Sequence, residues 1–323
     1  MRTLRLTVVI VTVLLVLAYS AKGQPLSIYE IQYTTDPNGD SPHNGNIVDC
    51  LGGIVIHKSP PSTRPKLTLY DPNNPDGWGG IMVKDLLSTG DFDSIELGDW
   101  IALTSVLVEE FKGTTYLQYT PDNDAAFTII TRNNPAPRPL LLTADQIAAP
   151  VQGPDHWTVA DRSAEKYEAM LVKVFDVSVA DTGYGKAADN YVLESNSSPG
   201  SACWGSDYMN IDNEEIYHAY VQVGQSFCGV AGIIEQYTGE KSGVSYDYYQ
   251  LLTLDTDSFT IDQPADLDDN CGVDMVDFSL FARHWVEDGC STQQGCAEAD
   301  LTQDGTVDNY DLFEFSQYWL EGK

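Results

Sequence analysis

The chain has 323 residues and a formal net charge of −31, from 48 acidic and 17 basic side chains. This length allows two or three domains. A surface that binds phosphate needs clustered Lys and Arg, and we find no such cluster along the sequence. The composition therefore disfavours nucleic acid as the principal ligand.

Residues 1–23 predict a secretory signal peptide. Two arginines precede an apolar run over residues 6–18, and small residues follow it. The run is too short to cross a bilayer comfortably, and cleavage after Ser20 or after Gly23 satisfies the small-residue rule. We therefore expect a secreted or cell-surface protein, with no membrane span in the mature chain.

Residues 24–131 predict a first β domain. Residues 27–33 form a short strand or a helical turn, and a turn-rich loop follows. Five runs then favour strands: Ile47–His57, Lys66–Tyr70, Gly80–Lys84, Ile101–Glu110 and Thr115–Tyr119. Their order, with a Gly-rich loop over residues 76–80, indicates a small barrel of the OB type.

Residues 132–159 predict a connector. Its first part, residues 132–139, is rich in proline. A short capped helix is expected at residues 143–149.

Residues 160–262 predict a second OB-like β domain. Residues 167–179 alternate apolar and polar side chains, as strands do, and further strands are expected at 191–194 and 207–211. The stretch from Val223 to Gly239 aligns with that from Leu97 to Gly113. Both have Gly at the second position, then a β run, then Glu, an aromatic residue and Gly. We therefore expect a second copy of the first barrel.

Catalytic motifs are not evident in the sequence. The five histidines are scattered without a zinc-binding spacing, and there is neither a Gly-x-Ser-x-Gly elbow nor a phosphate loop. Adjacent acids such as Glu109 and Glu110 are expected to be solvated strand-end charges. No catalytic residue is assigned.

Aromatic residues suggest a different role for the body. Trp78 and Trp204 are expected in Gly/Ser-rich loops at similar places in the two repeats. An exposed aromatic ring beside Asp and Asn can stack on a sugar ring, so both are candidate ligand-binding residues. The alternative is that each Trp covers its own barrel.

The six cysteines suggest disulfides in an exported chain. Three lie in the body and three in the last sixty residues, so either one bridge joins the two parts or two thiols stay free. We expect Cys203 to pair with Cys228, and Cys271 to pair with Cys290 or Cys296.

Residues 264–323 contain one pattern twice. Two twelve-residue loops, 266–277 and 300–311, carry oxygen-bearing side chains at positions 1, 3, 5, 9 and 12 and Val at position 8. After each loop, residues 278–285 and 312–319 have the apolar spacing of an amphipathic helix. Calcium takes six to eight oxygen ligands at about 2.3–2.6 Å, so each loop can wrap one ion. We also expect Val273 and Val307 to pair the two loops through a short strand-like contact.

Two calcium sites are therefore predicted. The ligands of the first are Asp266, Asp268, Asn270, the Gly272 carbonyl, Asp274 and Asp277. The ligands of the second are Asp300, Thr302, Asp304, the Thr306 carbonyl, Asp308 and Asp311. Thr302 supplies a neutral oxygen where an acid or amide is usual, so the second site is expected to be weaker.

This loop–helix pair, with Asp at position 12, resembles a type I dockerin of the planctomycete type. The resemblance implies a small helical, EF-hand-like module that docks onto a cohesin-type protein partner. Positions 10 and 11 (Met275-Val276 and Asn309-Tyr310) and the helix surfaces would set partner choice. The body is similar, through residues 165–172 and its glycine-led hairpins, to tandem OB-like regions of secreted bacterial nucleases and related exported proteins.

The fold class expected is a mainly β body of two OB-like barrels with a small α-helical tail. The leading function is a secreted, non-catalytic adaptor whose body binds an extracellular ligand such as a polysaccharide. The first alternative is a polysaccharide-degrading enzyme, since dockerins elsewhere usually carry such enzymes. The second is that the tail is a structural calcium clamp on the body.

Overall fold

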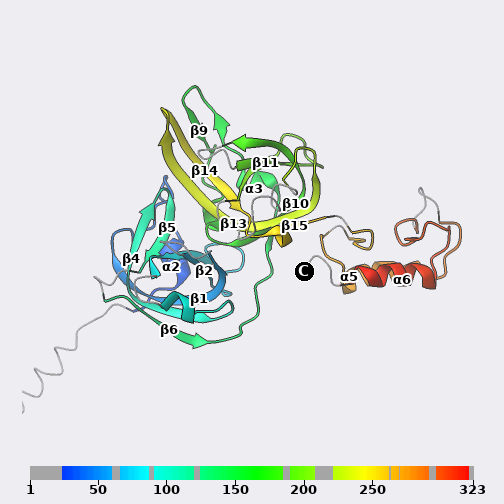
Figure 1. Cartoon of the computed structure of the whole chain (residues 1–323), viewed down its shortest axis with the longest axis horizontal. Coiled ribbons are helices and arrows are strands. Elements are labelled where there is room, and N and C mark those ends of the chain that lie inside the picture. The colour runs from blue at the N-terminus through cyan, green and yellow to red at the C-terminus, as the bar shows by residue number, and fades with distance from the viewer. Residues whose placement is uncertain are drawn as a thin grey trace, which may run out of the picture.

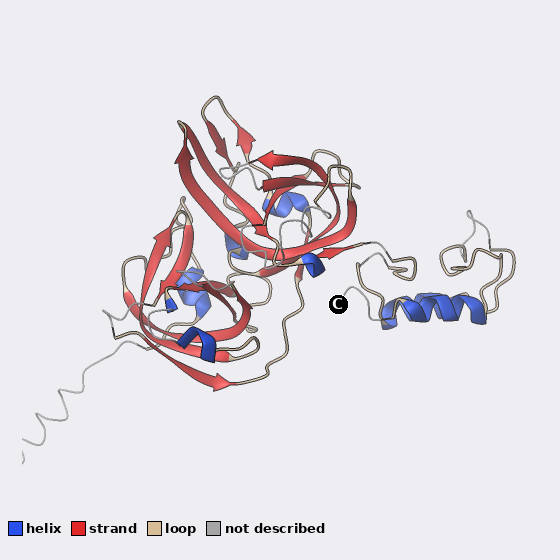
Figure 2. Cartoon of the chain, viewed as in Figure 1, coloured by secondary structure: helices blue, strands red, loops and turns tan. Residues whose placement is uncertain are grey.

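The computed structural model describes residues 24–59, 66–86, 91–119, 124–184, 190–207, 221–261, 263–268, 270–290 and 296–319. Within these ranges the chain is mainly β, with a few short helices (Figure 2). Figure 1 shows two β units side by side and a tail with helices α5 and α6 at one end. The predicted signal peptide lies outside the described residues. Of the helices described, none has the length and apolar character needed to cross a membrane.

The first unit is a closed five-stranded barrel. Its strands pair in the ring order β1-β2-β3-β5-β4, and β4 closes back onto β1, while β6 extends the sheet beside β4. The ring consists of β1 (Ile47–Lys58), β2 (Lys66–Tyr70), β3 (Gly80–Lys84), β4 (Trp100–Phe111) and β5 (Thr114–Gln118), with β6 at Ala126–Thr131. The five predicted strands are confirmed to within a residue or so at each end.

The second unit repeats this ring. Its order is β10-β11-β12-β14-β13, with β13 closing onto β10. In both rings one pair of strands is parallel, β3 with β5 in the first and β12 with β14 in the second. The strands are β10 (Leu171–Tyr184), β11 (Asn190–Ser195), β12 (Ala202–Ser206), β13 (Ser226–Lys241) and β14 (Val244–Leu252). The predicted duplication of the barrel is therefore seen in the strand order.

Residues of the expected connector join the second barrel. Strand β7 (Leu140–Leu142) pairs with β10, β9 (His156–Thr158) pairs with β14, and β8 (Val151–Gln152) pairs with β9. The expected short helix is α3 (Ala144–Ile147), and β15 (Phe259–Thr260) pairs with β13. The remaining short elements are α2 (Ile28–Gln32) and the 3-10 turns η2 (Asp91–Ser94), η4 (Glu165–Tyr167) and η5 (Thr256–Ser258).

Each barrel has its own apolar core. In the first, α2 inserts Ile28 and Ile31, both fully buried, among side chains from the five strands. Ser27 caps this helix and Glu30 returns a hydrogen bond to the Ser27 N–H. This reciprocal capping box fixes the start of a helix too short to be stable alone.

The two barrels meet through a third, smaller cluster. Met82 and Tyr116 of the first barrel pack with Ala169, Ile233 and Leu252 of the second. A side chain at Gly80 would come within 2.3 Å of the Ala169 backbone. Glycine at this position therefore permits the close approach of the two barrels.

The tail consists of two loop–helix units with a shared core. Helix α5 (Met275–Arg283) packs on α6 (Asn309–Gln317), with the Phe281 and Phe315 rings 5.3 Å apart. Val273 and Val307 are fully buried in this core. The expected pairing of the two valines is wrong, because the Val307 backbone bonds instead to Val286 and Glu287.

The disulfides differ from the expected pairs. Cys228 of β13 is bonded to Cys271 of the first loop, and Cys290 is bonded to Cys296. Cys50 and Cys203 are free and buried. The predicted Cys203–Cys228 bridge is wrong, since Cys203 faces the barrel core. A bridge therefore does join the body to the tail, and two thiols also remain free.

Candidate metal centre

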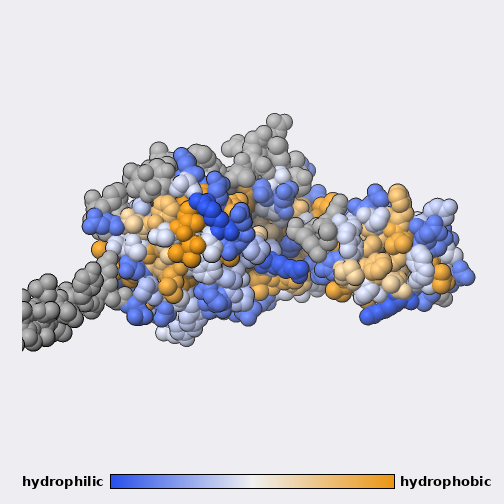
Figure 3. Space-filling view, turned by 90° about the horizontal axis from the view of Figure 1, so that it is seen from below, coloured by the Kyte–Doolittle hydropathy of each residue, from blue (hydrophilic) through white to orange (hydrophobic). Residues whose placement is uncertain are grey.

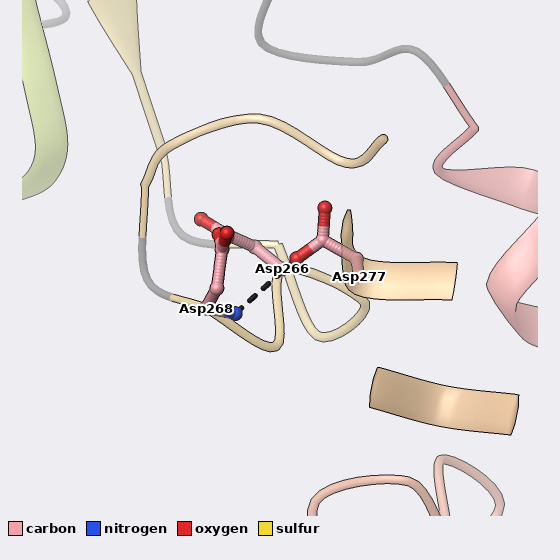
Figure 4. A group of neighbouring side chains, drawn as sticks. All are labelled: Asp266, Asp268 and Asp277. Carbon is pink, nitrogen blue, oxygen red and sulfur yellow. Dashed lines mark hydrogen bonds between the residues drawn. The ribbon is translucent and has the colours of Figure 1, made fainter. Parts of the chain in front are cut away.

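Three carboxylates converge in the first tail loop. Asp266, Asp268 and Asp277 each offer an oxygen, and these oxygens all lie within 4.8 Å of one another (Figure 4). Oxygens on opposite sides of one Ca²⁺ ion lie up to about 5 Å apart, given metal–oxygen distances of about 2.3–2.6 Å. The spacing of these three side chains fits a shared cation.

Backbone N–H groups hold these carboxylates in place. Asp266 accepts from Asn270 N–H (3.1 Å) and Cys271 N–H (2.7 Å). Asp277 is fully buried and accepts from Leu267 N–H (2.8 Å) and Asp274 N–H (2.6 Å). The carboxylates at the first and last positions of the loop therefore accept hydrogen bonds from backbone groups along the rest of it.

The second loop repeats this pattern. Asp300 accepts from Asp304 N–H (3.1 Å) and Gly305 N–H (2.9 Å). These donors lie four and five residues after Asp300, as the donors to Asp266 do in the first loop. Asp311, fully buried like Asp277, accepts from Thr302 N–H (2.9 Å) and Asp308 N–H (2.8 Å). The predicted duplication extends to the hydrogen bonds.

Position 6 takes the left-handed backbone conformation in both loops. Gly305 has φ 95° and Cys271 has φ 68°. Glycine adopts this conformation without strain and cysteine does not. The first loop nevertheless holds a cysteine there, and that residue forms the bridge to β13.

The acids at positions 9 and 12 also start the helices. Asp274 caps α5 by accepting from Val276 N–H (2.8 Å), and Asp308 caps α6 by accepting from Tyr310 N–H (2.7 Å). With Asp277 and Asp311 three residues later they form capping boxes. Loop closure and helix initiation therefore use the same side chains.

The two loops differ at position 3. Asp268 places a carboxylate in the first cluster, whereas the Thr302 hydroxyl donates to the Asp311 carboxylate (2.9 Å). The position-5 residues Asn270 and Asp304 are exposed. At position 7, Gly272 is buried and Thr306 is half-buried.

The first cluster is electrostatically crowded. The pKa of Asp266 is raised to about 6, chiefly by burial and also by the Asp277 and Asp268 carboxylates, while the hydrogen bonds from Cys271 N–H and Asn270 N–H lower it. Burial and Asp277 likewise raise the pKa of Asp268. A cation placed among these groups would relieve this repulsion.

The two tryptophans proposed to bind ligand have different surroundings. Trp204 lies within strand β12, is 1 % exposed, and packs on Trp157 and Tyr248. Its expected position in an accessible loop is wrong. Trp78 is half-buried beside the second barrel, where its backbone N–H donates to the Lys166 carbonyl (2.6 Å). The structure does not bring the two tryptophans to one surface.

A cavity of about 370 Å³ between the barrels contains groups that the sequence analysis missed. Among its described lining residues are three lysines, Lys66, Lys112 and Lys241, and one acid, Glu235. The lysines are far apart in sequence, so no run of basic residues marks them. The sequence feature that could have identified two of them is their position at hairpin turns that contain glycine. Lys112 lies at the β4–β5 turn and Lys241 at the β13–β14 turn.

Three glutamates lie near the contact of the barrels. Glu168 is 2 % exposed and accepts from Thr115 N–H (3.0 Å), and Glu165 accepts from the Tyr249 hydroxyl (2.6 Å). Burial raises the pKa of Glu165 to about 7, and burial together with Glu165 and Glu110 raises that of Glu168. Glu110 accepts from Ser41 N–H and Thr115 Oγ1.

The expectation that Glu109 and Glu110 are solvated is therefore wrong. Glu110 is partly buried, and burial raises its pKa. Glu109 pairs with the nearly buried Lys84 at 2.5 Å.

Comparison with solved structures returns only distant likenesses. A replication protein A heterotrimer bound to ssDNA matches at 10 % identity and a TM-score of 0.26, covering 72 % of this chain and 69 % of that one. Fission yeast Pot1 with ssDNA matches at 12 % identity and a TM-score of 0.28, covering 72 % and 85 %. Likenesses this weak carry no argument about function. No protein-family model and no curated protein matches the chain.

Proposed function

We propose that residues 264–319 form a calcium-ordered docking module of the dockerin type. The observation that carries the proposal is the pair of equivalent loops, each closed by a fully buried Asp and each running directly into a capped helix. The first loop supplies a cluster of carboxylates at calcium spacing. Bound calcium would supply the positive charge that holds these acids together.

Apolar side chains at the module surface support a protein partner. Several large hydrophobic residues of the two loop–helix units are exposed, in contrast to the buried Phe281 and Phe315: Met275, Val276, Trp285, Val286, Tyr310, Leu312, Phe313 and Trp319. Figure 3 shows apolar residues reaching the surface of this part of the molecule. Exposed apolar groups gathered on one small unit are typical of protein-binding surfaces.

Partner choice would rest on positions 10 and 11 of each loop. Met275, Val276 and Tyr310 are 63 %, 50 % and 65 % exposed, at the start of α5 and α6. The two helices present different residues there, so we propose that one face of the module binds a cohesin-type domain rather than both faces equally.

Calorimetric titration of the full chain with Ca²⁺ tests the metal sites. We expect two sites, with Asp277→Asn removing the tighter and Asp311→Asn the weaker. Thr302→Asp should raise the affinity of the weaker site, because it restores a charged ligand. No calcium binding, or tighter binding at the second loop, would contradict this assignment.

Docking is tested separately by surface plasmon resonance with a type I cohesin domain. Phe313→Ser and Tyr310→Ser should weaken a calcium-dependent interaction. Val223→Ser, which removes an equally exposed apolar residue from the body, should not. Calcium binding without any cohesin interaction would refute docking and leave the metal sites standing.

A structural calcium clamp is the second candidate, and the Cys228–Cys271 bridge favours it. This bridge fixes the first calcium loop to strand β13. If the clamp is the function, calcium should raise the stability of the second barrel, and the helix-surface variants should be neutral.

A further inference from the structure

We propose that the cavity between the two barrels binds a short acidic saccharide, a hydroxyl-rich ring carrying a carboxylate. The inference goes beyond the docking function and involves none of the tail residues. It rests on the charge, the aromatic surfaces and the hydrogen-bonding groups that the barrels bring together.

Both barrels build the cavity, and their backbones fix its shape. The β4–β5 hairpin lies against β13, where Thr114 Oγ1 donates to the Gln236 carbonyl and Thr238 N–H donates to the Lys112 carbonyl, each at 2.6 Å. At about 370 Å³ the cavity falls at the lower end of the range for small-molecule sites. It has room for a short ligand.

The charge of the cavity is opposite to that of the protein. Its described lining contributes three ammonium groups and one carboxylate, in a chain of net charge −31. Lys66 lies 3.6 Å from Glu235 and donates to the Tyr116 hydroxyl (2.8 Å). Among the described lining residues, positive charges therefore outnumber negative ones, which favours an anion.

Aromatic rings stand beside these charges. Lys112 Nζ lies over the Phe111 ring at 5.3 Å and over the Tyr237 ring at 5.5 Å, and so links the two barrels. Phe111 is 42 % exposed. Rings placed at the edge of a cavity can pack on the apolar face of a sugar.

Amide groups supply contacts for hydroxyls. Asn190 donates to Gln250 (2.7 Å), which in turn donates to Glu235 (2.8 Å), so the polar groups on this side form a connected and buried network. Gln236 is 1 % exposed and donates to Asp247, while its Oε1 has no hydrogen-bond partner in the described part of the chain. A buried acceptor of this kind costs free energy unless a donor reaches it, and a sugar hydroxyl is such a donor.

These features favour a short acidic sugar over a nucleic acid. No arginine is among the described lining residues, although its planar fork is the side chain best suited to phosphate. The strong negative charge of the whole chain opposes the approach of a long polyanion. A small sugar with a single carboxylate would experience less of that repulsion, and its carboxylate would pair with the lysine ammonium groups.

The test is calorimetric titration of the calcium-loaded full chain with digalacturonate and glucuronate. Cellobiose is the neutral probe of similar size, and adenosine monophosphate is the phosphate probe. We expect saturable binding of the acidic sugars, weaker at high salt, and at least tenfold weaker binding of cellobiose. Lys112→Ala and Lys241→Ala, both at exposed residues, should each weaken binding of the acidic sugars about two- to fivefold.

Lys166→Ala is the matched control. Lys166 lies outside the cavity lining and has a similar cation–π contact, at 4.7 Å over Tyr167, so its removal should leave binding unchanged. The proposal would be overturned if cellobiose bound as tightly as the acidic sugars, if the Lys112 and Lys241 variants bound the acidic sugars as tightly as the wild type, or if no acidic sugar bound saturably. Tighter binding of adenosine monophosphate than of the uronates would reassign the cavity to nucleotides.

Discussion

The body and the tail of this protein both bury acidic side chains, but around cores of very different size. Among the residues that the structure describes, twenty-two buried residues form the core of the second barrel, and buried acids such as Glu165 and Glu235 have hydrogen-bond partners within the fold. The described part of the tail has a core of eight buried residues, two fully buried acids, and three carboxylates whose oxygens lie within 4.8 Å of one another. The difference indicates that packing stabilises the body, whereas the tail has a small core and a disulfide bond to the body. The calcium ions proposed above would add stability that this small core does not provide.

Removing core volume from the body should have the largest effect. Trp204→Ala deletes a side chain that is 1 % exposed, and such truncations cost about 3–5 kcal/mol. We expect urea unfolding to move to lower concentration while calcium binding by the tail is unchanged. Trp78→Ala, at a half-buried position, should cost less. Equal costs at the two positions would contradict the core role of Trp204.

Cutting the link between body and tail should come next. The Cys228–Cys271 bridge closes 43 residues, and the chain-entropy relation gives about 4 kcal/mol for such a loop. The Cys290–Cys296 bridge closes only six residues, for which the same relation gives about 2 kcal/mol. Double Cys→Ser variants, compared by denaturant unfolding, should rank in this order. The reverse order would show that strain or local packing dominates.

Chelation should act on the tail alone. A ligand at a hundredfold excess over its Kd stabilises the folded state by about 2.7 kcal/mol. Addition of EDTA should therefore raise amide exchange about a hundredfold in residues 266–319, read by mass spectrometry on the intact chain. Strands β3 and β10 serve as internal controls and should keep their protection. Loss of protection in both regions together would show that they unfold as one unit.

The smallest effect should come from the glutamates between the barrels. The folded-state pKa of Glu165 is raised from 4.5 to about 7. An acid whose pKa is higher in the folded state than in the unfolded state destabilises the fold once it ionises. The stability is therefore full below the unfolded-state pKa and is lost as the pH rises through the folded-state pKa. We therefore expect the body to lose on the order of 1–3 kcal/mol between pH 4.5 and pH 8.

Glu168→Gln should flatten this pH dependence. The substitution keeps an oxygen for Thr115 N–H and removes a charge that raises the cost of ionising its neighbour. The variant should match the wild type near pH 4.5 and exceed its stability at pH 8, measured by thermal unfolding. A variant as pH-sensitive as the wild type would exclude the glutamates as the cause.

Sequence patterns recover elements whose signal is local. The strands from Ile47 to Gln118 follow from β-favouring runs between turns, and the two tail helices follow from their apolar spacing. The helices begin at Met275 and Asn309, three residues before the predicted starts, because Asp274 and Asp308 cap them. The hairpin turns illustrate the limit. Lys112-Gly113 and Ser242-Gly243 both have positive φ, as two-residue hairpin turns require, but β13 has sixteen residues and β4 has twelve. The aligned Gly239 therefore lies inside a strand rather than at its turn.

Features formed between distant segments could not be predicted. Trp204 stands in a stretch of small residues, yet β9 covers it through Trp157, a contact set by pairing with β14. The disulfide between Cys228 and Cys271 depends on how the tail packs against β13. The lysines of the cavity converge only because the two barrels pack together.

The position of the body–tail bridge has a mechanical consequence. A partner that pulls on α5 and α6 would transmit force back along the chain, and this force reaches Cys271 before it reaches residues 261–268. At Cys271 a covalent path leads directly into β13, the longest strand of the second barrel described here. The peptide segment that precedes Cys271, with Asp266 and Asp268, is then bypassed by the disulfide. Such tension would be resisted by the disulfide and the sheet, while the first half of the first tail loop would carry no load.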